Sequence, residues 1–235
     1  MALDLCIPAH NEAGVIQEAI RRTVLALADS GISDWHIVVV DNASNDGTAG
    51  AARAYQDARV SVVRIETKGK GAAILAAACE RDSELFGFID ADLSADPADI
   101  ARLAAFVSDG ATDIAVGSRL LDQTSVHRSW LRTFPSICFN WLRKCLIGIR
   151  VHDSQCGLKV MNATGRRVLA SCTETGWFLD LEFLARAERT GLSIREVPIH
   201  WEEERFAGRR SQLGFSDNFR AIVAMFRIRR ALRER

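Results

Sequence analysis

At Phe86-Gly-Phe-Ile-Asp90-Ala-Asp92, an apolar run is followed by two carboxylates that lie two residues apart. The run has the length and composition of a short strand buried in a sheet. Two carboxylates at the end of such a strand can hold a hard divalent cation and leave room for substrate phosphates. A strand followed by a solvated acidic turn would have the same sequence. The neighbouring motifs have to distinguish the two interpretations.

The first half of the sequence alternates between apolar runs and segments with helical spacing. We expect strands at residues 3–7, 36–40, 60–65, 86–90 and 113–117, and helices at residues 12–28, 49–56, 72–81 and 96–107. The run His36-Ile-Val-Val-Val40 is typical of a strand that is buried on both faces. This alternation predicts an α/β fold, with a mostly parallel sheet and helices on both faces.

Three polar clusters each follow one of the expected strands. They are Pro8-Ala-His-Asn-Glu12, Asp41-Asn-Ala-Ser-Asn-Asp46 and Asp90-Ala-Asp92. Sites in parallel α/β sheets lie beyond the carboxyl ends of the strands, which meet at one edge. We therefore expect the three clusters to converge on a single site.

The second half is less regular, and no linker or repeat divides it from the first. Residues 129–149 suggest an amphipathic helix interrupted at Pro135, residues 178–190 a helix and residues 194–200 a strand. Residues 215–233 place apolar side chains at helical spacing with arginines between them. We expect one domain over residues 1–235, ending in a basic amphipathic helix.

Composition restricts the function classes. The 30 basic and 30 acidic residues balance, yet the tail from Arg205 to Arg235 holds nine arginines against Asp217 and Glu234. The longest apolar candidate for a span, residues 133–142, is too short for a bilayer, and no signal peptide is recognisable. The six cysteines lack C-x-x-C pairs and zinc-like spacing, which indicates reduced thiols in a cytoplasmic protein. A nucleic-acid-binding function lacks a recognition motif, and the acidic centre argues against it.

Four motifs in order carry a family resemblance. Pro8-x-x-Asn11-Glu12, Val40-Asp41-Asn-Ala-Ser44-x-Asp46-Gly47-Thr48, Gly69-Lys70-Gly71 and Asp90-x-Asp92 together resemble family-two glycosyltransferases of the GT-A, Rossmann-like fold. The resemblance implies that residues 1–118 bind a nucleotide sugar and residues 119–235 an acceptor. It implies donor contacts from Pro8, Asn11, Glu12, Asp41, Lys70 and Asp90. It also implies a divalent metal, Mg²⁺ or Mn²⁺, held mainly by Asp92 with Asp90 beside it.

Each of these residues also has a local structural interpretation. Asp41 and Asp46 can organise an Asx-turn and cap the helix that follows Thr48. Lys70 between two glycines can be a solvated loop lysine, and Glu12 suits the start of a helix. The ordered series of motifs favours the ligand-binding interpretation for Glu12, Asp41, Lys70 and Asp92.

Motifs in the second half narrow the subgroup. Val116-Gly-Ser-Arg119, Asp153-Ser-Gln-Cys-Gly157-Leu-Lys159, Trp177-Phe-Leu-Asp180-Leu-Glu182 and Val197-Pro-Ile-x-Trp201 resemble the dolichyl- and polyprenyl-phosphate glucosyl- and mannosyltransferases. The resemblance implies catalytic roles for Asp92, Arg119, Asp153 and Asp180. It implies an acceptor side lined by Asp153, Gln155 and Lys159, with Asp180 and Glu182 behind them. Buried salt bridges with arginine remain the alternative for Asp153 and Asp180.

The sequence departs from the family pattern in three places. Ser94 stands where many relatives have a glutamine that assists the metal, and Asp41-Asn42 replaces a double aspartate. Gly208-Arg-Arg-Ser211 stands where a Gly-Ser-Lys ending is usual, so Arg209 and Arg210 are candidates for the acceptor phosphate. A sugar nucleotidyltransferase would need a glycine-rich loop after the first strand, and Ile7-Pro-Ala-His-Asn does not supply one.

The acceptor class follows from the balance of charged residues. A lipid phosphate is already anionic, so it needs cations such as Arg119, Lys159, Arg209 and Arg210 but no general base. A sugar hydroxyl would need a carboxylate base, for which Asp180 is the nearest candidate. The arginines favour a phosphate acceptor, with a hydroxyl acceptor as the alternative. The family resemblance implies inverting transfer of a hexose from a UDP-glucose or GDP-mannose type donor, and it implies a polyprenyl or dolichyl phosphate as the acceptor. The basic helix fits contact with the cytoplasmic face of a membrane or formation of a homodimer.

Overall fold

The computed structural model describes residues 1–121, 147–202 and 215–233. Most of the helix expected at residues 129–149 lies outside these ranges, and so do Arg209 and Arg210. Within α8 (Phe215–Ala231), side chains are described from Val223 onward.

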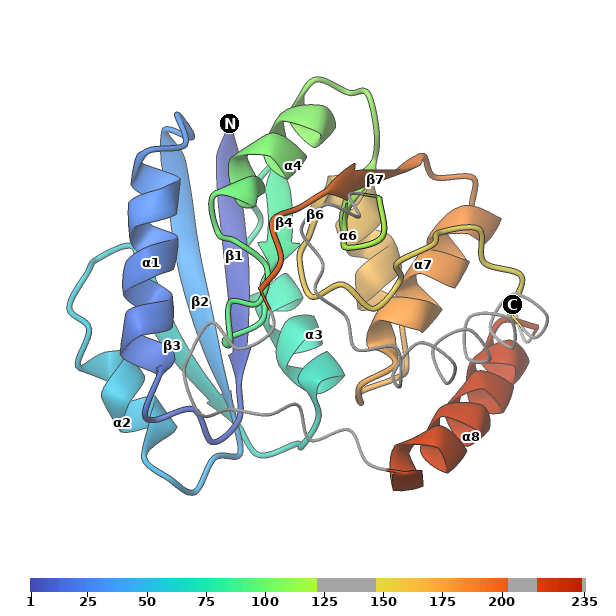
Figure 1. The fold of residues 1–235 in the computed structure, drawn as a ribbon, viewed down its shortest axis with the longest axis horizontal. Helices are drawn as coiled ribbons and strands as arrows, with labels where there is room; N and C mark the ends of the chain where they lie inside the picture. The colour runs from blue at the N-terminus through green and yellow to red at the C-terminus, as the bar shows by residue number, and fades with distance from the viewer. Residues whose placement is uncertain (122–146, 203–214, 234–235) are drawn as a thin grey trace.

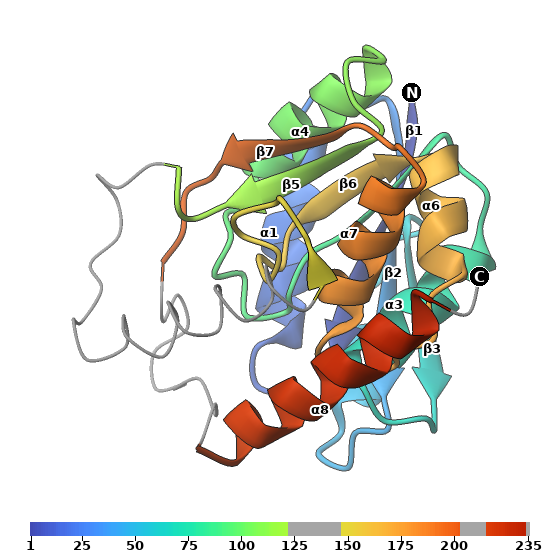
Figure 2. The same cartoon turned by 90° about the vertical axis from the view of Figure 1, so that its right-hand side faces the viewer.

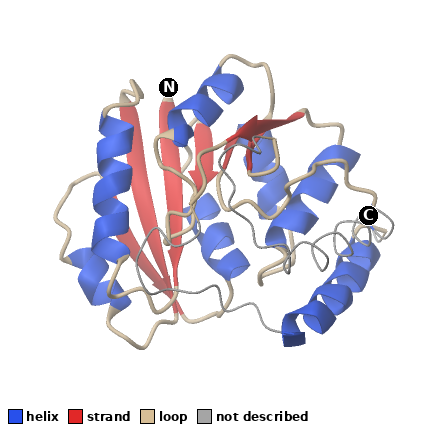
Figure 3. Ribbon diagram, in the orientation of Figure 1, coloured by secondary structure: helices blue, strands red, loops and turns tan. Residues whose placement is uncertain are grey.

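A seven-stranded sheet forms the centre of the molecule, in the order β3-β2-β1-β4-β6-β5-β7 (Figures 1 and 3). The strands are β1 (Ala2–Ala9), β2 (Asp34–Asn42), β3 (Val60–Ile65), β4 (Leu85–Phe88), β5 (Ile114–Ser118), β6 (Lys159–Asn162) and β7 (Ile194–Pro198). Strand β6 is antiparallel to β4 and β5, whereas all the other described pairs are parallel. The prediction of an α/β fold with a mostly parallel sheet is confirmed.

Helices cover both faces of the sheet (Figures 1 and 2). One hydrophobic cluster joins the sheet to α1 (Ile16–Ala28), α2 (Thr48–Arg53) and α4 (Asp99–Ser108). A second cluster joins the opposite face to α3 (Lys70–Glu80), α6 (Ala163–Ala170), α7 (Leu179–Arg189) and α8. Strand β2 contributes Ile37 and Val39 to the first cluster and Val38 and Val40 to the second, as expected for a strand buried on both faces.

The ends of several elements differ from expectation for identifiable reasons. Strand β1 continues through Pro8, because at that level β4 has ended and β1 is flanked only by β2. Helix α1 begins at Ile16, since the carbonyl of Glu12 accepts the N–H groups of Val15 and Ile16 in a turn. Strand β4 ends at Phe88, so Asp90 and Asp92 lie on the loop that follows.

Strand β6 and helix α6 were not predicted. The strand has only four residues and begins with a lysine, so no apolar run marks it in the sequence. Asn162 ends the strand and caps the helix, because its side chain accepts the N–H groups of Thr164 and Gly165. The strand joins the two halves of the chain into one sheet, while the functional division at residue 118 stays a prediction.

Within the ranges that the structure covers, no helix is long and apolar enough to cross a bilayer.

The amphipathic helix α1 provides a test of the packing. Leu27 is 0% exposed and Leu25 is 50% exposed on the same helix. Leu27→Ala should lower the free energy of unfolding by about 2–5 kcal/mol, because it leaves a cavity in the core. Leu25→Ala should change it by less than about 0.5 kcal/mol. Urea titrations of both variants check this, and equal effects would contradict the assigned face.

Candidate active site

The predicted motifs meet at one edge of the sheet. This edge holds the carboxyl ends of β1, β2, β4, β5 and β7 and, because β6 is antiparallel, the amino end of β6. Strand β1 descends to it from the N-terminus at the top of Figure 1. The edge therefore gathers the three polar clusters, together with Arg119 and Lys159.

Hydrogen bonds join the loops that follow β1 and β2. The N–H of Asn11 donates to Ser44 Oγ at 2.9 Å, and the N–H of Glu12 donates to Thr48 Oγ1 at 2.8 Å. Asp46 Oδ2 accepts the N–H of Ala13 at 3.1 Å, while its Oδ1 accepts the N–H of Thr48 at 3.1 Å. Asp46 thus organises the turn before α2, as its structural interpretation predicted. These bonds hold the first two motifs as one rigid unit.

Non-glycine residues adopt left-handed backbone conformations in three loops at this edge. Their φ angles are 56° at Asn11, 52° at Ala43 and 49° at Leu93. Such conformations cost free energy and persist where the surrounding structure enforces them, which is common at functional sites. Each follows a different parallel strand, so the strain is concentrated where the motifs converge.

Asp41 is fully buried at the end of β2. Its Oδ2 pairs with Arg64 Nη1 at 3.1 Å. Its Oδ1 is buried without a hydrogen-bond partner among the described residues. A buried acceptor left unpaired is costly, and an N–H or O–H donor of a ligand that reached this oxygen would remove that cost.

Asn42 explains why an amide can replace the second aspartate of the motif. Its Nδ2 donates to the carbonyl of Thr67 at 2.6 Å, and its Oδ1 accepts the N–H of Gly69 at 2.7 Å. An ionised aspartate could accept but could not donate. The amide thus fixes the loop that leads into α3 beside the second motif.

The glycines on either side of Lys70 allow close backbone packing. A Cβ on Gly69 would lie 2.0 Å from the carbonyl oxygen of Thr175, and one on Gly71 would lie 2.7 Å from the carbonyl carbon of Thr175. The N–H of Gly71 donates to the carbonyl of Gly176 at 3.1 Å. Only glycine fits at both positions. The start of α3 is thereby locked against the loop before α7.

Four charged side chains form a continuous chain at the centre of the site. Lys70 Nζ lies 2.6 Å from Asp90 Oδ1 and 3.8 Å from Asp180 Oδ2. Lys159 Nζ lies 2.5 Å from Asp180 Oδ1 and 2.6 Å from the carbonyl of Cys156. Burial alone would lower the pKa of Lys70, but Asp90 and Asp180 outweigh it and raise that pKa above its usual value. Lys70 is therefore a fully charged ammonium.

Asp90 and Asp92 differ in their surroundings. The Asp90 carboxylate lies against the backbone at Gly157, where a Cβ would approach its Oδ2 to 2.0 Å. Asp92 is exposed, and its Oδ1 accepts the N–H of Ser94 at 2.9 Å. The protein around Asp92 still removes part of its solvation. This desolvation and the nearby charge of Asp90 raise the pKa of Asp92. Hydrogen bonds from the backbone and the side chain of Ser94 oppose this rise.

The carboxylates of Asp90 and Asp92 suit a cation that also binds oxygens of a substrate. No group of three or more His, Cys, Asp or Glu side chains suited to a metal occurs within the described ranges. Two adjacent carboxylates at an open edge match the way Mg²⁺ binds, with one or two carboxylates, phosphate oxygens and water. Desolvation and, after it, the charge of Asp90 raise the pKa of Asp92, and a cation would offset the second of these effects.

Arg119 and Asp153 form a nearly buried pair beside this chain. Arg119 Nε and Nη2 donate to the Asp153 carboxylate at 2.8 and 2.7 Å, and the backbone N–H of Arg119 donates to it at 2.8 Å. Burial opposes both charges, yet the pairing raises the pKa of Arg119 and lowers the pKa of Asp153. This is the arginine salt bridge foreseen as the alternative for Asp153.

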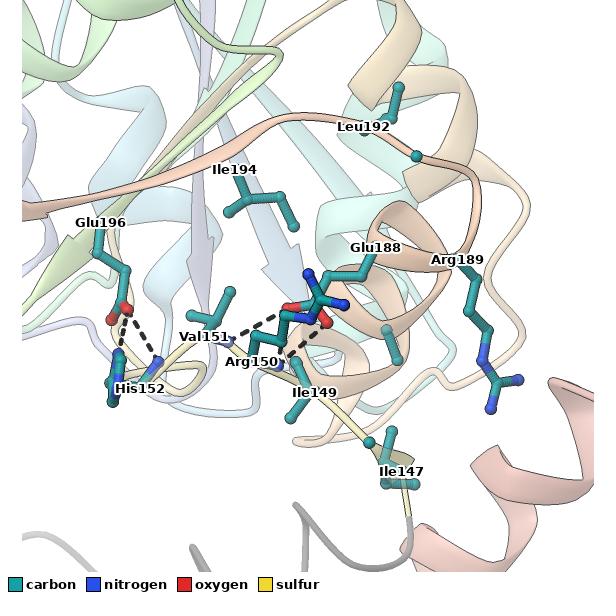
Figure 4. A pocket seen from close by; sticks show the side chains of 13 residues that line it. Ile147, Ile149, Arg150, Val151, His152, Glu188, Arg189, Leu192, Ile194 and Glu196 are labelled. Atoms are coloured by element: carbon teal, nitrogen blue, oxygen red, sulfur yellow. Dashed lines mark hydrogen bonds and ion pairs between the residues drawn. The ribbon is translucent and has the colours of Figure 1, made fainter.

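Two glutamates fix the segment that carries Asp153. Glu188 of α7 accepts the N–H groups of Arg150 and Val151 at 2.9 and 3.2 Å. Glu196 of β7 accepts those of His152 and Asp153, at 2.9 and 2.8 Å. Figure 4 shows both carboxylates in the lining of a cavity. The cavity has a volume of about 550 Å³, and its lining does not include Lys70, Asp90, Lys159 or Asp180. No sequence motif singles out either glutamate.

The predicted site residues that the structure describes fall into three groups. Those gathered at the edge are Pro8, Asn11, Glu12, Asp41, Lys70, Asp90, Asp92, Arg119, Asp153 and Asp180. Lys159 is 0% exposed and holds Asp180, and Gln155 Nε2 is buried without a hydrogen-bond partner among the described residues. Glu182 accepts N–H groups of Thr173 and Glu174 and so supports the loop before α7.

Comparison with solved structures places this architecture in the GT-A class. Glucosyl-3-phosphoglycerate synthase from Mycobacterium tuberculosis, in a complex with Mn²⁺, UDP-glucose and phosphoglyceric acid, superposes with a TM-score of 0.68. The two chains are 18% identical, and the match covers 97% of this chain and 79% of the synthase chain. At 18% sequence identity, the structural similarity shows that the two chains share a fold.

The family follows from the sequence match. The model of glycosyl transferase family 2 matches residues 4–169, and the chain belongs to this family. It is 29% identical over 205 residues to the glycosyltransferase AglD of Haloferax volcanii, covering 85% of this chain and 33% of the relative. It is 28% identical over 225 residues to the dolichyl-phosphate beta-glucosyltransferase of Saccharomyces cerevisiae, covering 86% of this chain and 67% of the relative. The chain thus spans a third of the first relative and two thirds of the second.

Removal of the Asp153 charge should destabilise the fold in a pH-dependent way. Because pairing lowers the pKa of Asp153, its contribution is present above the usual aspartate pKa and is lost as the pH falls through the folded-state value. Asp153→Asn should lower the free energy of unfolding by about 1.5–3 kcal/mol at neutral pH. The difference from the parent should shrink below about pH 4.

Denaturant titrations across that pH range measure the effect. Asp109→Asn, at an exposed position after α4, is the matched control and should change little. A difference between Asp153→Asn and the parent that stays constant from neutral to acid pH would contradict the ion pair.

Proposed function

We propose that the chain transfers a hexose, with inversion, from a nucleotide sugar to a polyprenyl or dolichyl phosphate. The proposal rests on the sheet edge where the first motifs meet, as the expected site of the nucleotide sugar, and on the pairing of Asp180 with two lysines. Family membership supports nucleotide-sugar chemistry. The yeast relative, named a dolichyl-phosphate beta-glucosyltransferase, supports the acceptor class.

The observation that carries the acceptor assignment is the pairing of Asp180. This carboxylate is 2% exposed, with one oxygen 2.5 Å from Lys159 and the other 3.8 Å from Lys70. A general base for a hydroxyl acceptor must reach the proton that it removes and have an oxygen free to take it. Asp180 is buried and neutralised on both sides. That arrangement favours an acceptor that arrives already ionised.

The donor half of the reaction needs a stabilised diphosphate leaving group. Pro8, Asn11, Glu12 and Asp41 line the nucleotide side, and Asp41 Oδ1 offers a buried acceptor for a donor group of the base or ribose. Lys70 supplies a positive charge beside Asp90. A divalent cation bound by Asp92 and Asp90 would neutralise charge that develops on the diphosphate.

The acceptor half needs cations that orient a phosphate. The Arg119 guanidinium is held by Asp153 and lies 5.8 Å from the Trp201 ring, with 23% of its side chain exposed. We assign it to the acceptor phosphate, positioned through Glu196 and the segment that carries Asp153. Lys159 acts as a positioning residue that fixes Asp180. Arg209 and Arg210 stay candidates for the phosphate, outside the described residues.

Helix α8 supports a contact with a membrane surface. Its inner side buries Met225 and Ile228, whereas Val223 and Phe226 are 41% and 56% exposed. Exposed Arg227, Arg230 and Arg233 flank them. Apolar side chains beside arginines suit an anionic lipid surface, where a lipid-phosphate acceptor would be found. Self-association through the same face is the alternative, which sedimentation with and without anionic vesicles would separate.

Radiolabel transfer is the direct test of this function. With Mg²⁺ or Mn²⁺ and a short polyprenyl phosphate, UDP-glucose or GDP-mannose should yield a labelled lipid. Asp92→Asn should reduce the rate by roughly 100-fold or more, since a bound cation supplies several kcal/mol of charge stabilisation. Asp109→Asn should leave the rate unchanged.

The same assay distinguishes the hydroxyl alternative. If neither donor yields a labelled lipid although the nucleotides bind, the lipid-phosphate proposal fails. A labelled product with a hydroxyl acceptor that is lost in Asp180→Asn would then assign Asp180 as the base.

A further inference from the structure

We propose that Lys70 is a built-in counter-ion of Asp90, and that its ammonium moves to Asp180 when a divalent cation binds. Asp180 is then a positioning residue that sets the affinity for the cation without touching it. The inference rests on the metal site of the proposed function. It does not depend on which sugar or acceptor is used.

The first step is that Lys70 and a cation compete for the same carboxylate. Lys70 Nζ lies 2.6 Å from Asp90 Oδ1, which is closer than its 3.8 Å distance to Asp180 Oδ2. A divalent cation bound between Asp90 and Asp92 would lie within a few ångströms of that charge. Repulsion at such a distance is strong in a partly buried site. The ammonium therefore has to withdraw as the cation enters.

The second step is that a place for the ammonium already exists. Asp180 Oδ2 is 3.8 Å from Lys70 Nζ, and the Asp180 carboxylate is 2% exposed. Its other oxygen is occupied by Lys159, which is itself anchored by the carbonyl of Cys156. Lys159 thus leaves one oxygen of Asp180 facing Lys70. A small side-chain rotation would shorten this 3.8 Å ion pair to hydrogen-bond distance.

The third step is that only the side chain can move. The backbone on both sides of Lys70 is packed against Thr175 and Gly176, where any Cβ on Gly69 or Gly71 would clash. The N–H groups of Gly71 and Ala72 are bonded to the same loop. Trp177 borders the ammonium, with its ring centre 5.3 Å from Nζ. The lysine therefore shifts between two carboxylates inside a fixed frame.

Two possible roles of Lys70 predict different effects of Asp180 on cation binding. If Lys70 only repelled the cation, its loss and the loss of Asp180 would act independently. If Lys70 exchanges between the two carboxylates, Asp180 matters because it receives the ammonium. The effect of Asp180 on cation binding should then depend on whether Lys70 is present, which a double-mutant cycle measures.

Binding of Mn²⁺ alone, followed by electron paramagnetic resonance without nucleotide, tests the exchange. Lys70→Met should bind Mn²⁺ roughly tenfold more tightly than the parent, since a competing unit charge is removed at short range. Lys68→Met removes an exposed charge two residues away and should have little effect. Asp92→Asn should abolish the binding in both backgrounds, which identifies the site.

The double-mutant cycle completes the test. Asp180→Asn should weaken Mn²⁺ binding severalfold in the parent and much less in the Lys70→Met background. Circular dichroism and thermal melts establish that each variant is folded. If Asp180→Asn does not fold, Asp180→Ser takes its place in the cycle.

The proposal is overturned if Lys70→Met binds Mn²⁺ no more tightly than the parent. It is also overturned if neither the parent nor Lys70→Met binds Mn²⁺. Strictly additive effects in the cycle also overturn it. The Mn²⁺-binding assay contains neither a sugar donor nor an acceptor. Its result therefore stands even if the radiolabel assay yields no labelled lipid.

Discussion

The alternating charge chain Asp90–Lys70–Asp180–Lys159 ties the site together. It joins the loop after β4, the first residue of α3, the first turn of α7 and the amino end of β6. Charges at this depth are tolerated only when they are paired, and removal of one partner leaves another unpaired. The arrangement of the edge thus depends on all four side chains. Their charges cancel, so a cation and a diphosphate can be added without a large net charge in the interior.

Close backbone approach is the second constraint. Gly157 lets the Asp90 carboxylate lie against the chain, while Gly69 and Gly71 let α3 begin against the loop before α7. Left-handed residues in three neighbouring loops add conformational strain at the same edge. The hydrophobic clusters on both faces of the sheet supply the stability that this edge does not. Few other residue types would therefore fit at these glycine positions, where the backbone segments of the site approach one another closely.

The sequence predicts the parts of this account that depend on local patterns. The buried run of β2, the strand–helix alternation and the polar clusters after β1, β2 and β4 were all recognisable, because burial and strand direction leave a periodic signature. Strand β6 left none, since it is short, antiparallel and begins with a lysine. The full burial of Lys159 could not be foreseen either, because lysine is rarely buried without a partner that only the fold supplies. The roles of Asn42, Glu188 and Glu196 likewise depend on backbone groups brought close by folding.

We propose that this edge of the sheet holds a cation and a nucleotide diphosphate together. Anomalous X-ray diffraction from crystals grown with Mn²⁺ and UDP-glucose tests it most directly. The account predicts a manganese peak bonded to Asp92 and to the diphosphate, with Lys70 Nζ nearer to Asp180 than its present 3.8 Å. A bound nucleotide with manganese coordinated elsewhere, or with Lys70 still paired to Asp90 beside the metal, would contradict the account.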